Sequence, residues 1–284
     1  MTAGREIESG TRFAFGANWT SFLSTLDEQR VAAAEKSLRD MLGVESLAGL
    51  KFLDIGSGSG LFSLAARRLG ATVHSFDFDP QSVACTKELQ RRFFPADPHW
   101  TIEEGSVLDG TYLAKLGQFD VVYSWGVLHH TGSMWVAIEN AVGRVAKHDG
   151  TLFIAIYNDQ GWKSHLWWFI KSIYNRLPGI LRRPFAFLVS ALTRIAVIIK
   201  YTLKFKPMIG IAPLLGDRRG RGMSAKYDAV DWIGGFPFEF ARFESLVAYF
   251  AARGFELINS KQSGSLGCNE LVLRRTTESG SCVE

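Results

Sequence analysis

The chain of 284 residues contains little cysteine: only Cys85, Cys268 and Cys282, an odd number at wide spacing. Such a set supports neither a disulfide scaffold nor a zinc cluster, and it predicts a reducing compartment. The first ten residues, MTAGREIESG, lack the apolar core of a signal peptide. Nor is there a run of the roughly 18–20 uncharged apolar residues that a membrane-spanning helix needs. These absences predict a soluble, cytoplasmic protein.

Apolar and aromatic residues, by contrast, are abundant. Eight Trp and 21 Phe in a chain that is 47% apolar exclude a disordered or low-complexity protein. We find no internal repeat. The length suits one large domain, or a domain that carries a sizeable insertion.

Predicted strands alternate with predicted helices along the middle of the chain. After a helix from Asp27 to Gly43, the pattern predicts strands at Lys51–Ile55, Thr72–Phe76, His99–Glu103, Asp120–Ser124 and Thr151–Tyr157, with helices at Leu61–Leu69, Ser82–Phe93 and Met134–Val145. A helix at Phe243–Arg253 then precedes strands at Phe255–Lys261 and Asn269–Arg274, joined by a short turn. The alternation predicts an α/β, Rossmann-like, doubly wound sheet of seven strands whose last strand is antiparallel.

The segment after Tyr157 departs from this pattern for about seventy residues. Helices are expected at Ser164–Leu177 and Pro184–Lys204, the second opened by a proline at a favourable first-turn position. Between Gln160 and Lys226 there are thirteen Lys or Arg and one acid, so this segment carries +12 and the rest of the chain −8. The combination fits a membrane surface, a lipid-like acceptor with phosphate, another subunit, or simply a solvated helical surface.

Within this basic segment, Gly216–Gly222 is rich in Gly and Arg, is expected to be flexible, and includes Arg219 as a candidate acceptor contact. Nucleic acid is the weaker candidate partner, because no RNA-binding module is recognisable. The composition predicts four parts: an N-terminal helical cap (1–48), a core (49–157 and 227–275), a helical insertion for acceptor recognition (158–226), and a flexible tail (276–284).

A glycine-rich turn follows the first strand, in the run Phe52-Leu53-Asp54-Ile55-Gly56-Ser57-Gly58-Ser59-Gly60. Glycines let the backbone approach a ligand at the carboxyl end of a parallel sheet. Leu61 stands where a G-x-G-x-x-G fingerprint needs its third glycine, which argues against NAD. Asp77 ends the second strand, where a carboxylate can accept both ribose hydroxyls. Either motif alone is weak, but together they predict a nucleoside-containing ligand.

These motifs, with Phe119-Asp120-Val121-Val122, Asp149-Gly150 and the terminal hairpin, resemble the successive motifs of class I S-adenosylmethionine-dependent methyltransferases. Val127-Leu128-His129-His130 is most similar to the ubiquinone-type small-molecule methyltransferases. The resemblance implies S-adenosylmethionine as cofactor, with Asp54 beside its amino group, Asp77 on the ribose, and the segment after Gly105 along the adenine. The implied cofactor contacts are Asp54, Gly56, Ser57, Gly58, Gly60, Asp77, Phe78, Ser106, Val107 and Trp125. Many members have an acid where this chain has Ser106.

Methyl transfer from a sulfonium is an in-line displacement, so the protein must align the reactants, exclude water and control the acceptor's proton. His129 and His130 are the candidate bases, and the resemblance favours His130. Since adjacent side chains point in different directions, one is expected to act and the other to pack.

Tyr157, Asn158 and Trp19 are candidate acceptor contacts. The structural alternatives are core packing for Trp125, turn formation for Asn158, and attachment of the first helix to the sheet for the segment that contains Trp19. No cluster has metal-ligand spacing, so we expect no metal.

The sequence thus predicts O-methylation of a small, aromatic or prenylated, lipid-like acceptor. The alternatives are C-methylation of a phosphorylated isoprenoid or other anionic acceptor, nucleic-acid methylation, or a non-catalytic cofactor-binding module. A homo-oligomer and a peripheral position at the inner face of a membrane are both compatible with these features.

Overall fold

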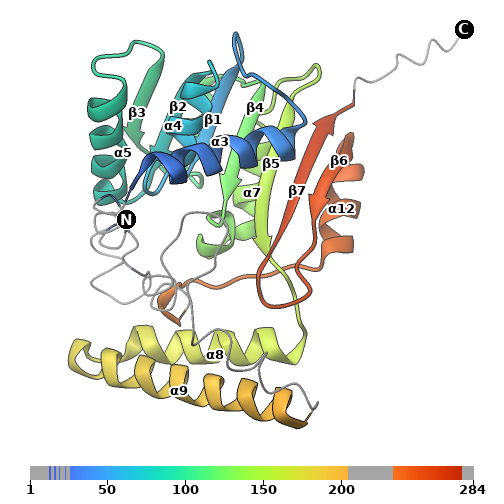
Figure 1. Cartoon of the computed structure of the whole chain (residues 1–284). Helices are drawn as coiled ribbons and strands as arrows, with labels where there is room; N and C mark the ends of the chain where they lie inside the picture. The colour runs from blue at the N-terminus through green and yellow to red at the C-terminus, as the bar shows by residue number, and fades with distance from the viewer. Residues whose placement is uncertain are drawn as a thin grey trace, which may run out of the picture.

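The computed structural model describes residues 26–203 and 233–276, together with Phe13, Gly16, Trp19 and Leu23. Its strands form a seven-stranded sheet in the order β3-β2-β1-β4-β5-β7-β6 (Figure 1). The first five strands pair in parallel, and β7 is antiparallel to both β5 and β6. The strands are β1 (Lys51–Ile55), β2 (Thr72–Asp77), β3 (Trp100–Glu104), β4 (Val121–Trp125), β5 (Thr151–Tyr157), β6 (Phe255–Lys261) and β7 (Cys268–Arg275). The predicted sheet and its antiparallel last strand are confirmed.

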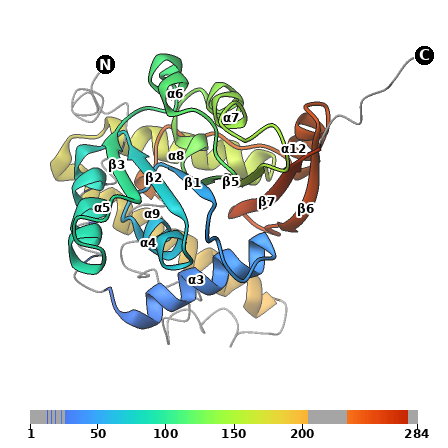
Figure 2. The same ribbon diagram turned by 90° about the horizontal axis from the view of Figure 1, so that it is seen from above.

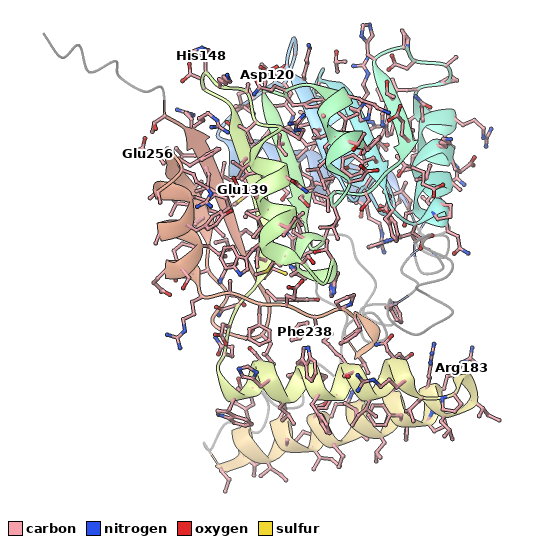
Figure 3. The ribbon with its side chains drawn as sticks, turned by 180° about the vertical axis from the view of Figure 1, so that it is seen from behind. Asp120, Glu139, His148, Arg183, Phe238 and Glu256 are labelled. Atoms are coloured by element: carbon pink, nitrogen blue, oxygen red, sulfur yellow. The ribbon has the colours of Figure 1, made fainter. Side chains whose placement is uncertain are left out.

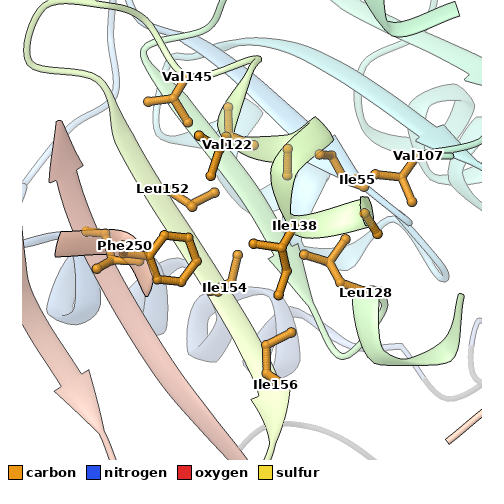
Figure 4. Packing of buried hydrophobic residues seen from close by; sticks show 14 of the residues in the cluster. Ile55, Val107, Val122, Leu128, Ile138, Val145, Leu152, Ile154, Ile156 and Phe250 are labelled. Atoms are coloured by element: carbon orange, nitrogen blue, oxygen red, sulfur yellow. The ribbon is translucent and has the colours of Figure 1, made fainter. Parts of the chain in front are cut away.

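Helices cover both faces of this sheet (Figure 2). One face is covered by α3 (Glu28–Leu42), α4 (Leu61–Arg68) and α5 (Pro80–Phe93), and the other by α6 (Gly110–Leu116), α7 (Met134–Val142) and α12 (Phe243–Ala251). Because side chains alternate along a strand, Phe52 of β1 packs toward α3 and α4 while Leu53 packs toward α7. Figure 4 shows the second of these cores, in which Leu128, Ile138, Ile154 and Phe250 are buried.

The helix α3 shows how local sequence sets the ends of an element. Its N-cap Asp27 accepts a hydrogen bond from the Arg30 backbone N–H at 2.8 Å, which satisfies one of the unpaired amides of the first turn. Gly43 closes the helix in the left-handed conformation, with φ of 68°. Both ends agree with the sequence prediction.

Two further helices, α8 (Trp162–Arg176) and α9 (Gly179–Leu203), lie side by side beyond the carboxyl ends of the parallel strands (Figure 1). Pro184 was expected to open the second helix, but it lies inside α9, so that expectation was wrong. The helix begins five residues earlier, and the Leu181 backbone N–H donates to the Pro178 carbonyl at 2.9 Å. A proline that precedes the first turn needs no amide partner, and it is Pro178 that fills this position.

One helix of the described part, α9, is long and apolar enough to cross a membrane by length and composition. Arg182, Arg183 and Arg194 lie within it. These arginines explain why no long uncharged run appears in the sequence.

Candidate functional site

The glycine-rich turn lies at the carboxyl end of β1, as its sequence predicts. Gly56, Gly58 and Gly60 have φ values of 77°, 55° and 80°, in the left-handed region that favours glycine. At Gly60 an added Cβ would lie 2.8 Å from the Thr86 Cα, a backbone atom that cannot easily move. These glycines therefore permit a tight turn that other groups can approach closely, because the glycines carry no side chains of their own.

Asp77 ends β2 beside this turn. One of its carboxylate oxygens accepts a hydrogen bond from the Gly58 backbone N–H at 2.9 Å, and the other accepts from the Asp79 N–H at 2.9 Å. Phe78, which follows, is half-buried. The structure thus brings the carboxylate expected on a ribose into contact with the glycine-rich turn.

Asp54 is almost completely buried at the end of β1 and closes a chain of hydrogen bonds. Trp100 Nε1 donates to Ser75 Oγ at 3.0 Å, Ser75 donates to Ser63 Oγ at 2.7 Å, and Ser63 donates to Asp54 Oδ2 at 2.5 Å. Burial raises the pKa of Asp54 to about 7, the Ser63 hydrogen bond opposes this rise, and the charge of Asp77 adds to it. The carboxyl therefore titrates near neutral pH.

Gly16 and Trp19, the two described residues that flank 17–18, lie beside this edge of the sheet. The Gly16 backbone N–H donates to Asp79 Oδ2 at 2.9 Å. A Cβ built on Gly58 would lie 3.0 Å from the indole of Trp19, so this ring packs directly against the glycine-rich turn. Trp19 is a predicted acceptor contact, and the structure places its ring beside the glycine-rich turn.

The segment expected along the adenine is a tight turn after β3. Ser106 Oγ accepts from the Leu108 N–H at 3.2 Å, so the hydroxyl is engaged locally. The Val107 side chain is buried in the core, and its carbonyl accepts from Asn140 Nδ2 at 2.8 Å. Trp125 ends β4 half-buried and packs against the core on the α3 side.

The two candidate bases lie on a short 3-10 helix, η1 (Leu128–His130), after β4. This helix starts against the glycine-rich turn, because a Cβ built on Gly56 would lie 2.5 Å from the Val127 side chain. Both imidazoles are buried, with ring centroids 4.5 Å apart.

His129 is fully buried against β5. Its Nδ1 accepts from the Tyr157 backbone N–H at 3.3 Å, and its Nε2 has no hydrogen-bond partner among the described residues. Burial first, and then the charges of His130 and Lys171, hold the pKa of His129 well below its usual range. This imidazole is neutral at pH 7 and a weak base.

His130 has a different environment. Its Nδ1 lies 2.5 Å from the Pro237 carbonyl oxygen, which can only accept, so Nδ1 carries the proton. That hydrogen bond fixes the tautomer in which the lone pair lies on Nε2. In neutral His130, Nε2 is therefore the basic nitrogen.

Residues 236–241, which follow the insertion in the chain, pack against the turn that carries the two histidines. The Glu239 backbone N–H donates to the His129 carbonyl at 2.9 Å. The Glu239 carboxylate accepts from the Met134 N–H at 3.1 and 3.0 Å and so caps α7. Burial raises the pKa of Glu239, and the backbone N–H groups of Met134 and Gly132 oppose the rise. Sequence reasoning missed this segment because its partners lie more than a hundred residues away.

Lys171 of α8 is the second residue that sequence reasoning missed. It is fully buried, with Nζ 4.7 Å from the Phe238 ring centroid and 5.9 Å from that of Tyr157. Figure 3 shows Phe238 between α8 and the core. Ser164, Lys171 and Asn175 are buried on one face of α8. Their helical spacing was the sequence signal from which this polar face could have been predicted.

The other candidate acceptor contacts, Tyr157 and Asn158, lie at the end of β5. The Tyr157 ring packs between His129, at a centroid distance of 4.0 Å, and Phe238, at 5.0 Å. Asn158 instead ties the β6–β7 turn, because its Nδ2 donates to Ser263 O at 2.7 Å and its Oδ1 accepts from Asn269 at 3.1 Å. Arg219 and Gly216–Gly222 lie outside the described residues.

Part of this core is similar to known proteins. Residues 53–154 match the family model described as "Methyltransferase domain". The chain is 33% identical over 130 residues to a ubiquinone biosynthesis O-methyltransferase of a Methylobacterium strain, covering 45% of this chain and 49% of that protein. It is 32% identical over 128 residues to the protein of the same name from Bartonella bacilliformis, covering 44% and 48%. The chain thus spans about half the length of the curated relatives it matches.

Solved structures show the same fold. Magnesium protoporphyrin IX methyltransferase from Synechocystis, with bound SAM, aligns with a TM-score of 0.51 at 11% identity, over 87% of this chain and 79% of that chain. An O-methyltransferase family protein from Burkholderia thailandensis aligns with a TM-score of 0.51 at 13% identity, over 87% and 57%. At such identities the likeness establishes the fold.

Proposed function

Because residues 53–154 match the model of a methyltransferase domain, we propose that the protein is a class I S-adenosylmethionine-dependent methyltransferase, and that it methylates a hydroxyl group of a small, aromatic or prenylated, lipid-like acceptor. The O-methyltransferases of ubiquinone biosynthesis among its relatives support a phenol-type hydroxyl. We place acceptor recognition in the helical insertion, residues 158–226.

The residues at the carboxyl edge of the sheet fit the cofactor. The turn through Gly56, Gly58 and Gly60 has no side chains of its own at these positions, and Asp77 offers a carboxylate beside it. Asp54 supplies a buried carboxyl that can pair with an ammonium group. When bound there, S-adenosylmethionine would supply an electrophilic methyl group on a sulfonium. The chain's own tasks are to orient the acceptor and to take its proton.

The observation that carries the proposal is the hydrogen bond from His130 Nδ1 to the Pro237 carbonyl. It holds Nε2 as the proton acceptor, on a turn that begins against the glycine-rich loop. His129, neutral and bonded to the Tyr157 amide, would hold this turn in place. His130 is therefore the base that we propose for the acceptor hydroxyl.

The variant His130→Asn tests this role. An amide nitrogen can keep the hydrogen bond to Pro237, but it cannot accept a proton, so turnover should fall about 10²–10⁴-fold. Turnover is followed as S-adenosylhomocysteine release in a screen of phenols, prenyl phosphates and glycosides. Cofactor affinity and melting temperature should stay near wild type. Full activity in this variant would assign the proton to another group or to solvent.

The variant Asp77→Ala tests the cofactor site. Loss of a charge-assisted acceptor should weaken S-adenosylmethionine binding by about 1.5–3 kcal/mol in titration calorimetry. Asp27→Ala is the matched control, because Asp27 also accepts a backbone N–H but caps the remote helix α3. Equal affinity in wild type and Asp77→Ala would remove Asp77 from the site.

A further inference from the structure

The helix α8 has its polar and apolar faces reversed. Its buried residues are Ser164, Lys171, Ser172, Tyr174 and Asn175. Its exposed residues include Trp162, Leu166, Trp168 and Phe169, with exposed fractions between 44% and 71%. A helix on the surface of a water-soluble domain normally turns its apolar face inward. The outer face of α8 therefore suits an apolar environment.

The neighbouring helix α9 continues this apolar surface. Phe187 is 77% exposed, Leu192 is 57% exposed and Ile195 is 53% exposed. Of the exposed large hydrophobic residues in the described part of the chain, all but Leu108, Trp135 and Val136 belong to α8 or α9. Figure 3 shows side chains projecting from the outer side of α9, away from the sheet. Contiguous exposed apolar surface of this kind marks an interaction site.

The charge of the two helices indicates which partner fits. Residues 160–203 contain seven Lys or Arg and no Asp or Glu. Of these, Lys163, Arg176, Arg183 and Arg194 are exposed, and Figure 3 labels Arg183 on α9. Apolar side chains flanked by cations complement the headgroup region of an anionic bilayer, where cations meet lipid phosphate and apolar groups reach the acyl chains.

We propose that the outer face of α8 and α9 binds the surface of an anionic lipid bilayer, with both helices lying along it. Crossing the bilayer is disfavoured because one side of α9 packs against α8, which holds the two helices side by side. Val189 packs beside Tyr174 of α8, and Arg182 donates to the Leu177 carbonyl at 2.9 Å and to the Asn175 carbonyl at 3.0 Å. Asn175 in turn donates to the Gly234 carbonyl at 2.8 Å.

This surface also has a defined orientation relative to the candidate site. The α8–α9 pair lies beyond the carboxyl ends of the parallel strands, on the same side as the glycine-rich turn and the two histidines (Figure 1). A bilayer bound there would face the edge of the sheet at which the acceptor is expected. This orientation rests on the proposed function, whereas the lipid binding itself does not.

Co-sedimentation of the full chain with vesicles tests the proposal. We expect binding to vesicles that contain phosphatidylglycerol, weakened by salt, and little binding to pure phosphatidylcholine. Phe187→Glu with Ile195→Glu, and separately Arg183→Glu with Arg194→Glu, should each reduce binding more than about tenfold. Val136→Glu is the matched control, since Val136 is 54% exposed but lies on α7, and it should bind as wild type.

Three results would overturn the proposal. The first is absence of binding to either vesicle. The second is a dimer in sedimentation velocity that Phe187→Glu with Ile195→Glu converts to monomer, which would make the face a subunit interface. The third is resistance of vesicle-bound protein to alkaline extraction, which would indicate a crossing helix. Titration calorimetry of S-adenosylmethionine on the same α9 variants distinguishes failure of lipid binding from failure of the proposed function. The substituted positions lie away from the glycine-rich turn, so cofactor affinity should stay near wild type whether or not the vesicles bind.

Discussion

At the scale of single residues, burial moves two ionisable side chains at the carboxyl edge of the sheet toward their neutral forms. It raises the pKa of Asp54 to about 7 and holds the pKa of His129 well below its usual range. In both cases desolvation is the largest cause. Asp54 can still be ionised by a cationic ligand, whereas His129 is left as a neutral packing group.

The raised pKa of Asp54 predicts a pH-dependent cofactor affinity. An ammonium group beside Asp54 favours the carboxylate, so binding must expel a proton when the pH is below about 7. Affinity should therefore rise with pH, by up to about tenfold per unit between pH 5.5 and 7, and then level off. Titration calorimetry over this range measures the slope. In Asp54→Asn the affinity should be lower and the slope lost. A slope that persists would mean that another group titrates.

The sequence predicted Asp54, Asp77 and the glycines because their signals are local and follow the strands directly. It could not predict the partners of the histidines. His130 and Pro237 are separated by 107 positions, and Glu239 is separated from Met134 by 105. Only the crossing of residues 236–241 over the sheet edge brings them together. The burial of Lys171 was not predicted for a different reason: a lysine in a basic segment is normally expected to be exposed to solvent.

At the scale of elements, short apolar runs placed the strands well. The predicted bounds of β1, β5 and β6 agree with the structure, β2 is one residue longer at its end, and β4 is shifted by one residue at both ends. The seven-residue helix α6 was missed because it is too short to show an apolar period. Its N-cap Asp109, which accepts from the Tyr112 N–H at 3.0 Å, was the available signal.

Two glycines at helix ends predict different costs of substitution. Both Gly43 and Gly60 have left-handed φ, at 68° and 80°. Around Gly43 nothing lies within 4 Å of an added Cβ, so Gly43→Ala should cost only about 1–2 kcal/mol. At Gly60 the Cβ would also meet the Thr86 backbone at 2.8 Å, so Gly60→Ala should cost about 2–4 kcal/mol. Urea unfolding of both variants provides the comparison, and equal losses would contradict the packing argument.

At the scale of the whole molecule, His129 predicts a loss of stability in acid. Its pKa is depressed in the folded chain, so the unfolded chain binds the proton first as the pH falls. Its contribution is therefore complete above about pH 6.5 and is lost below it, by up to about 1.4 kcal/mol per pH unit.

Urea unfolding at several pH values between about 7.5 and 5 measures this loss. His129→Gln should flatten the dependence, although it lowers the stability at pH 7.5. His148→Gln, which alters an exposed turn residue, should leave the dependence unchanged (Figure 3). An unchanged pH dependence in His129→Gln would mean that other groups determine acid unfolding.

The reversed polarity of α8 also has a kinetic consequence. An enzyme held at a bilayer meets a lipid-like acceptor by lateral diffusion, at the concentration that the acceptor has among the lipids. Its apparent KM would then follow the mole fraction of acceptor in the vesicle rather than the amount in the whole solution. Dilution of the acceptor with inert lipid would slow turnover, while dilution of the vesicles with buffer would not, as long as the protein remained bound. A loosely fitting acceptor pocket would suffice under these conditions, because confinement to the surface raises the effective concentration of the acceptor.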